Sequence, residues 1–178
     1  MIFTETKIAG AYVIDVELRR DERGYFARAW CAREFAEHGL TATLAQANIS
    51  YNERASTLRG MHFQRAPHEE AKLVRCTRGA IWDVCLDLRP TSETYLQSFG
   101  TELTAENGRA LYVPEGCGHG YLTLVEGTET IYLVTEFYAP GTEGGARWDD
   151  PAFGIEWPDA GPLTISEKDA AWPDWAPE

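Results

Sequence analysis

The stretch AIWDVCLDL, Ala80 to Leu88, alternates two kinds of side chain with a period of two. Asp83 and Asp87 stand on one parity. The other parity is apolar and holds Ala80, Trp82, Val84, Leu86 and Leu88. Because successive side chains of a strand point to opposite faces, the pattern predicts a strand with one core face and one polar face.

Similar short segments, rich in β-branched and aromatic residues, recur between turn signals along the chain. They are YVIDVEL (12–18), LAQANIS (44–50), KLVRCT (72–77), ALYVP (110–114), YLTLV (121–125) and ETIYLVTEFY (129–138). Many short strands at this spacing indicate an all-β sandwich or barrel. The best helical candidate is CAREFAEHGL (31–40), in which Gly39 stands where helices usually end.

After residue 140 the chain becomes rich in Gly, Pro and Trp, through GTEGGARWDDPAFGIEWPDAGP (141–162) to AAWPDWAPE (170–178). This composition predicts an irregular segment that packs over the sandwich through its aromatic rings. We find no internal repeat or linker, and 178 residues with 44% hydrophobic composition predict a single domain over residues 1–178.

Charge and cysteine content exclude several classes of function. A formal net charge of −12 argues against nucleic acid or anionic lipid as a partner, since both need a surplus of Lys and Arg. No apolar run approaches the roughly 18 residues of a membrane helix, and the N-terminus lacks the pattern of a signal peptide. The four cysteines contain no C-x-x-C pair, so we expect reduced thiols in a cytoplasmic protein.

Candidate chemistry begins at LRGMHFQ (58–64), which places Arg59 and His62 in a predicted strand. Lys72 follows on the next strand, and His119 is flanked by glycines in PEGCGHGY (114–121). An isolated histidine is more often a satisfied core residue, and glycines also mark tight turns. Arg59 and His62 have opposite parity, so both point inward only if a bulge occurs at Gly60.

Two tyrosines share a parity in IYLVTEFY (131–138). In a continuous strand, Tyr132 and Tyr138 would lie about 20 Å apart on one face, which is comparable to the length of a nucleotide-sugar. Taken alone, the two rings fit cross-strand packing equally well.

Taken in order, these motifs resemble those of the dTDP-4-dehydrorhamnose 3,5-epimerase family of deoxysugar and polysaccharide biosynthesis. The resemblance covers nearly the whole chain, in DERGYF (21–26), QANIS (46–50), LRGMHFQ (58–64), KLVRCTRGAIWDV (72–84), PEGCGHGY (114–121), the 132–138 strand, RWDDP (147–151) and SEKD (166–169). It implies an all-β, cupin-type double-stranded β-helix (jelly roll) with one or more short helices and an irregular, aromatic-rich C-terminal segment.

The resemblance also implies an isomerase that inverts C3 and C5 of a 4-keto-6-deoxy nucleotide-sugar without metal or cofactor. His62 would be the base, Asp169 would orient its imidazole, and Tyr132 would supply the proton from the other face. Lys72 would stabilise the enolate at the C4 oxygen. Without the family, Lys72 and Asp169 would be read as ordinary salt-bridge residues. From pattern alone, Asp83 is a candidate partner for Lys72.

Further residues match the family's substrate contacts. Arg59 and His119 match contacts to the diphosphate, and the remaining matches are Gln46, Asn48, Glu143 and Lys168, with Arg23, Phe26 and Tyr138 at the nucleobase. Arg28 stands where the family usually carries a glutamate. A guanidinium cannot accept a hydrogen bond from thymine N3–H, so a preference shifted from dTDP toward CDP is one interpretation. The other is that Arg28 turns to solvent or pairs with a carboxylate.

The same motifs are also compatible with other classes of protein. A metal-dependent cupin oxygenase could assemble His62, His68, His119 and Glu69 or Glu70, although the tight H-x-H arrangement is absent. A non-catalytic module that binds sugar nucleotides, a 3,4-ketoisomerase and a single-carbon epimerase are compatible with them too. The family exchanges N-terminal strands, so the resemblance further implies a homodimer in which residues near Arg23 and Phe26 complete the neighbour's pocket.

Overall fold

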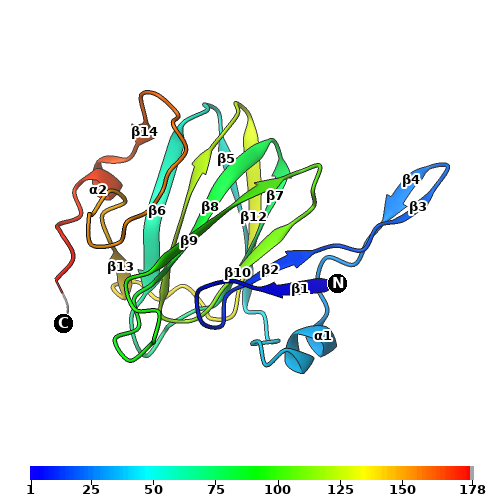
Figure 1. The fold of residues 1–178 in the computed structure, drawn as a ribbon, viewed down its shortest axis with the longest axis horizontal. Coiled ribbons are helices and arrows are strands. Elements are labelled where there is room, and N and C mark those ends of the chain that lie inside the picture. The colour runs from blue at the N-terminus through cyan, green and yellow to red at the C-terminus, as the bar shows by residue number, and fades with distance from the viewer. Residues whose placement is uncertain (177–178) are drawn as a thin grey trace.

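In the computed structural model, which describes residues 1–176, the chain forms two large sheets that face each other (Figure 1). The first sheet contains, in spatial order, β1 (Ile2–Glu5), β2 (Tyr12–Asp15), β10 (Ala110–Val113), β7 (Lys72–Arg78), β12 (Thr128–Val134) and β5 (Gln46–Asn52). The second contains β13 (Glu143–Gly145), β6 (Thr57–Gln64), β11 (Cys117–Thr123), β8 (Ala80–Asp87) and β9 (Ser98–Thr104). Neighbours in these two strand orders are antiparallel, which confirms the predicted all-β sandwich.

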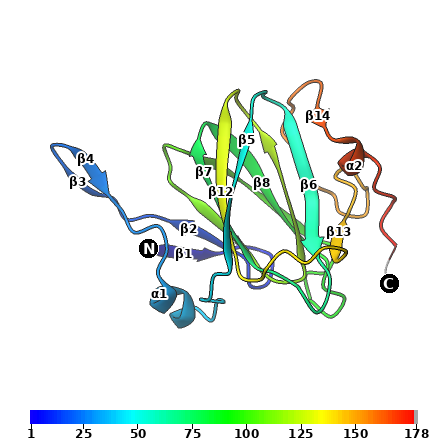
Figure 2. The same ribbon diagram turned by 180° about the vertical axis from the view of Figure 1, so that it is seen from behind.

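Two smaller elements lie outside the sandwich near the N-terminus. β3 (Arg19–Asp21) and β4 (Gly24–Phe26) form a hairpin that projects away from both sheets (Figures 1 and 2). Helix α1 (Ala32–Glu37) buries Phe35 with Ile14 and Tyr112 of the first sheet. The helix falls within the predicted segment 31–40, so that prediction is confirmed. Within residues 1–176 no helix is both long and apolar enough to cross a membrane.

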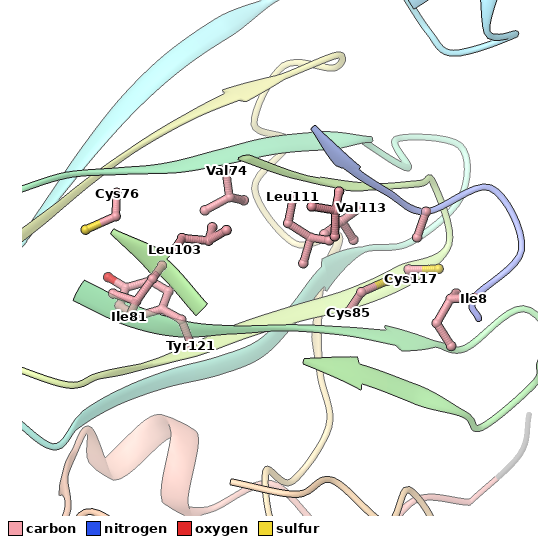
Figure 3. Close-up of a cluster of buried hydrophobic side chains, with 12 residues drawn as sticks. Ile8, Val74, Cys76, Ile81, Cys85, Leu103, Leu111, Val113, Cys117 and Tyr121 are labelled. Carbon is pink, nitrogen blue, oxygen red and sulfur yellow. The ribbon is translucent and has the colours of Figure 1, made fainter. Parts of the chain in front are cut away.

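Apolar side chains from both sheets fill part of the space between them (Figure 3). Val74 and Leu111 come from the first sheet, and Ile81, Leu103 and Tyr121 come from the second. All five are at most 4% exposed. This apolar cluster supports the two sheets at a fixed separation, and the polar cavity described below opens beside it.

Strand β8 differs from its prediction in which face is internal. Asp83 and Asp87 share the inward parity with Ile81 and Cys85, and both aspartates are 0% exposed. The apolar parity points outward instead, and the C-terminal segment covers it. The predicted separation of an apolar face from a polar face is present, but the assignment of the apolar face to the interior of the sandwich is wrong, because the aspartate face points between the sheets and a second layer of chain buries the apolar face.

The C-terminal segment forms that covering layer. Phe153, Trp157 and Trp175 pack on the outer face of the second sheet, against Val84 and Leu86. Within this segment, β14 (Thr164–Ile165) pairs in parallel with the start of β6, and α2 (Glu167–Ala170) follows at once. The prediction of an irregular, aromatic-anchored segment is confirmed for residues 141–176, and its last two residues lie outside the described part of the chain.

The predicted bulge in β6 is present. His62 is opposite His119 and Arg59 is opposite Tyr121, so three steps along β6 match two steps along β11. Gly60, which lies between, has a φ of +134°, and a Cβ there would stand 2.5 Å from the Cα of Gly120. Only glycine fits both the conformation and the space. The bulge turns Arg59 and His62 to the same side of the strand.

We expect Gly60→Ala to destabilise the protein by more than the roughly 1–3 kcal/mol of a strained backbone, because the new methyl group also meets the β11 backbone. Urea denaturation followed by far-UV circular dichroism measures the change. Gly154→Ala is the matched control, since Gly154 also has a positive φ of +52° but has open space around it. Equal stability of the two variants would contradict this account of the bulge.

Candidate active site

A cavity of about 370 Å³ opens between the sheets beside the apolar cluster. It is lined by side chains of β5, β6, β7, β11 and β12, by residues that follow β12, and by α2. The lining residues are Ser50, Arg59, His62, Phe63, Gln64, Glu70, Lys72, His119, Tyr121, Tyr132, Tyr138, Glu143, Gly144 and Lys168. Eight of the predicted site residues are among them, so the motifs scattered along the chain converge on one cavity.

His62 forms a hydrogen-bonded pair with Asp169 at the wall of this cavity. The Nε2 of His62 lies 2.7 Å from Oδ1 of Asp169, and the backbone N–H of Gly60 donates to Oδ2 at 3.3 Å. Burial alone would raise the pKa of Asp169, but the hydrogen bond and charge of His62 and the Gly60 N–H lower it overall. An ionised Asp169 accepts a hydrogen bond from Nε2–H, which leaves Nδ1 as the unprotonated nitrogen of a neutral ring.

Local structure explains why Asp169 reaches His62. β14 pairs with β6 through Thr164 opposite Thr57 and Ile165 opposite Leu58, which places the start of α2 beside the bulge. Ser166 caps α2, its side chain accepting from the backbone N–H of Asp169. The parallel pairing of β14 with β6 thus places the carboxylate of Asp169 beside the imidazole of His62, although the two residues are 107 positions apart in the sequence.

Tyr132 faces the same cavity from β12 in the opposite sheet. Burial raises the pKa of its phenol, and the charges of Tyr121 and Glu70 raise it further, whereas Arg59 lowers it. A raised pKa keeps the phenol protonated at neutral pH. His62 on one sheet and the protonated phenol of Tyr132 on the other can therefore contact opposite faces of a molecule bound between them.

Lys72 and Asp83 do not pair, so that sequence-based prediction is wrong. Lys72 Nζ donates to Glu70 instead, and both side chains are nearly buried. Asp83 faces His119, with Oδ1 of the carboxylate 2.8 Å from Nε2 of the ring. Burial raises the pKa of Asp83, although the charge and hydrogen bond of His119 offset part of this effect. The pairing of β8 with β11, which alternation cannot reveal, brings Asp83 to His119, whereas the partner of Lys72 lies only two residues before it in the sequence.

Arg59 is held at one end of the cavity by residues that the sequence analysis missed. Its Nε donates to Oδ1 of Asn52 at 2.8 Å, and the Nδ2 of Asn52 donates to the hydroxyl of Tyr121 at 3.2 Å. Ser50 lies 2.9 Å from the same hydroxyl. Ser50 and Asn52 share the parity of the predicted Gln46 and Asn48 on β5, so extending that pattern would have found them.

The other end of the cavity carries Tyr138, Glu143 and Lys168. The Tyr138 hydroxyl donates to Glu143, and the backbone N–H of Tyr138 donates to Gln46 at 2.7 Å. Strand β12 ends at Val134, so Tyr132 and Tyr138 do not lie on one straight strand as predicted. The chain bends after β12 and brings both rings to the same cavity. Asn48 pairs with Tyr132 across the strands without lining the cavity.

Three predicted substrate contacts lie elsewhere. Arg23 is on the projecting hairpin and forms an ion pair with Asp21, and Phe26 is 68% exposed. Arg28 forms an ion pair with Glu34 at 2.7 Å, which favours the interpretation that it pairs with a carboxylate. These residues do not join the cavity of their own chain, and a role in binding stays a prediction.

The residues do not fit the metal site considered from the sequence. In the part of the chain that the structure describes, no three His, Cys, Asp or Glu side chains form a group that could hold a metal ion. His62 and His119 are each hydrogen bonded to their own carboxylate, and Glu70 is engaged by Lys72. The geometry therefore disfavours a metal-dependent oxygenase.

Comparisons with known proteins agree with the sequence resemblance. The model of the family described as dTDP-4-dehydrorhamnose 3,5-epimerase matches residues 5–177. A protein of that name from Salmonella typhimurium is 41% identical over 97% of this chain and 94% of its own length. A dTDP-4-dehydrorhamnose 3-epimerase from Streptomyces niveus is also 41% identical, over 91% of this chain and 78% of its own.

The fold agrees as well. The crystal structure of dTDP-4-dehydrorhamnose 3,5-epimerase from Elizabethkingia anophelis matches with a TM-score of 0.94 and 38% identity, covering 98% of this chain and 96% of the other. The predicted cupin-type jelly roll is thereby confirmed. On the extent of the family match and the identity to its members, this chain belongs to the dTDP-4-dehydrorhamnose 3,5-epimerase family.

Proposed function

We propose that the protein is a nucleotide-sugar epimerase that inverts C3 and C5 of a dTDP-linked 4-keto-6-deoxy sugar. The observation that carries this proposal is the pair of opposed groups in one cavity: His62, paired with Asp169, on one sheet, and protonated Tyr132 on the other. The names of the relatives support the substrate class.

The chemistry follows from the acidity of hydrogens beside a ketone. His62 removes the proton from the carbon, and the bonding electrons move into an enolate whose negative charge lies on the C4 oxygen. Lys72 in the cavity wall stabilises this charge in a nearly buried setting, where a cation has its largest effect. Tyr132 then donates a proton to the opposite face of the carbon. Exchange with solvent returns a proton to Tyr132 and removes one from His62.

Cationic side chains gather around this cavity although the whole chain carries a formal net charge of −12. Arg59, Lys72 and Lys168 line it together with His119. A local cluster of this kind can bind the diphosphate of a nucleotide-sugar despite overall repulsion, because nearby charges dominate over screened distant ones.

We also propose that the active protein is a homodimer whose hairpins complete each other's sites. The β3–β4 hairpin lies at the opposite end of the molecule from β6 (Figure 2). It carries Arg23 and Phe26, the residues expected at the nucleotide, and it exposes the rings of Tyr25 and Phe26. The edge strand β5 exposes Ile49 and Tyr51 as well. Apolar exposure at an unpaired strand edge is characteristic of a surface that another chain covers.

Light scattering should give a dimer mass. Mixing two inactive variants, His62→Asn and the double variant Arg23→Ala/Phe26→Ala, should restore roughly a quarter of the wild-type activity, because each mixed dimer contains one intact site. A monomer, or a mixture as inactive as its components, would contradict the exchange.

We expect His62→Asn to lower kcat by at least about 10²–10⁴-fold while dTDP still binds, because the base acts on the transition state and not on the nucleotide. Steady-state kinetics and calorimetric titration with dTDP measure the two effects separately. His38→Asn is the matched control, since the His38 ring stacks on Phe3 and lies outside the cavity. Near-normal turnover by His62→Asn would exclude His62 as the base.

Deuterium incorporation in D₂O tests the reaction itself. We expect the wild type to incorporate solvent deuterium at both C3 and C5 of a dTDP-4-keto-6-deoxy sugar, detected by NMR and mass spectrometry. Incorporation at C3 alone would identify a single-carbon epimerase, and none at either carbon would refute the proposed function. UDP- and CDP-linked substrates, run in parallel with the wild type and with Arg28→Glu, show whether Arg28 alters the nucleotide preference.

A further inference from the structure

A second carboxylate, Glu70, lines the cavity and is absent from the chemistry described above. Its side chain is 12% exposed, and that of its partner Lys72 is 7% exposed. Oε1 of Glu70 accepts from Lys72 Nζ, while Oε2 accepts from Nε2 of Gln64 at 3.1 Å. Both oxygens are therefore occupied by donors from two different strands, β6 and β7.

Gln64 is itself fixed, so it holds Glu70 in one place. Its Nε2, which has two N–H groups to share among three acceptors, also lies 3.0 Å from the carbonyl oxygen of His68 and 3.2 Å from that of Phe137. Its Oε1 accepts from the backbone N–H of Ala139 at 2.8 Å. The Gln64 amide thus ties Glu70 to the chain segment that carries Tyr138, another residue of the cavity wall.

The position of Lys72 depends on this arrangement. A lysine ammonium is a point charge on a flexible stem with three donors, so its location is set by the acceptors around it. A nearly buried ammonium also requires a counter-charge, because removing one partner of such a pair leaves an uncompensated charge. Glu70 supplies both the acceptor and the counter-charge.

We propose that Glu70 is a positioning residue that acts through Lys72, an inference that rests on the proposed function. Glu70 holds the Lys72 ammonium where the enolate oxygen forms, so that the site does not have to reorganise as negative charge develops. The carboxylate itself needs no contact with the substrate. In the absence of Glu70, Lys72 is free to adopt other rotamers, and the catalytic step slows while binding of the nucleotide is retained.

A double-mutant cycle on the full chain separates this role from a merely structural salt bridge. We expect Glu70→Gln to lower kcat by about 10- to 100-fold and to change KM by less than about threefold, since misplacing a catalytic group affects mainly the transition state. In a Lys72→Met background, the same Glu70→Gln change should alter kcat by less than about threefold, because residues that act as a unit are not additive.

Glu69→Gln is the matched control, because Glu69 carries the same charge one position away but lines a neighbouring cavity. It should retain wild-type kcat. If Glu70→Gln does not fold, as judged by thermal unfolding and dTDP binding, Glu70→Asp serves instead. That variant keeps the charge on a shorter stem, and it should show a smaller loss of kcat at unchanged KM.

Three outcomes would overturn the inference. They are losses of kcat that multiply in the double variant, an effect confined to KM, and a wild-type kcat in Glu70→Gln or Glu70→Asp. These outcomes are distinct from failure of the proposed function. If the proposed function is wrong, the wild type itself incorporates no deuterium at C3 or C5. If only the inference is wrong, the wild type exchanges normally and Glu70 acts independently of Lys72.

Discussion

The hydrogen bond between His62 and Asp169 is the interaction on which the rest of the site depends. It joins β6 to a helix of the C-terminal segment, and several independent features are needed to make it. The bulge at Gly60 turns His62 inward, and the pairing of β14 with β6 places the C-terminal segment alongside that strand. The aromatic layer over the second sheet then holds the segment in place. Packing far from the cavity thus determines the position of the His62 imidazole.

The interior of the jelly roll accepts many ionisable groups because each has a specific partner. His119 meets Asp83, and Lys72 meets Glu70. Burial works against the charge of Asp87, but hydrogen bonds from Arg89, Ser92 and Thr94 lower its pKa to about 2. Buried ions without such partners would destabilise the fold by several kcal/mol each. The apolar cluster between the sheets supplies the burial that stabilises the fold as a whole.

The two sheets have different roles in the site. The second sheet supplies His62 and the carboxylate-paired His119, whereas the first supplies Tyr132 and Lys72. A planar enolate held between them would meet a basic group and an acidic group from opposite sides. The jelly roll is well suited to this arrangement, because its facing sheets are held apart by side chains and leave a cavity where those side chains are polar.

The sequence by itself determined most strands of the two sheets, the short helix, the bulge at Gly60 and most residues of the cavity, because alternation, glycine positions and family motifs are local patterns. It missed β1 and β9. Only the tertiary structure decided which face of β8 is internal, because both faces of that strand are covered and alternation cannot rank them. The partner of Asp83 likewise depends on which strands become neighbours, because His119 lies on β11 beside β8. Tyr138 reaches the cavity through a bend after Val134, which no periodic pattern encodes.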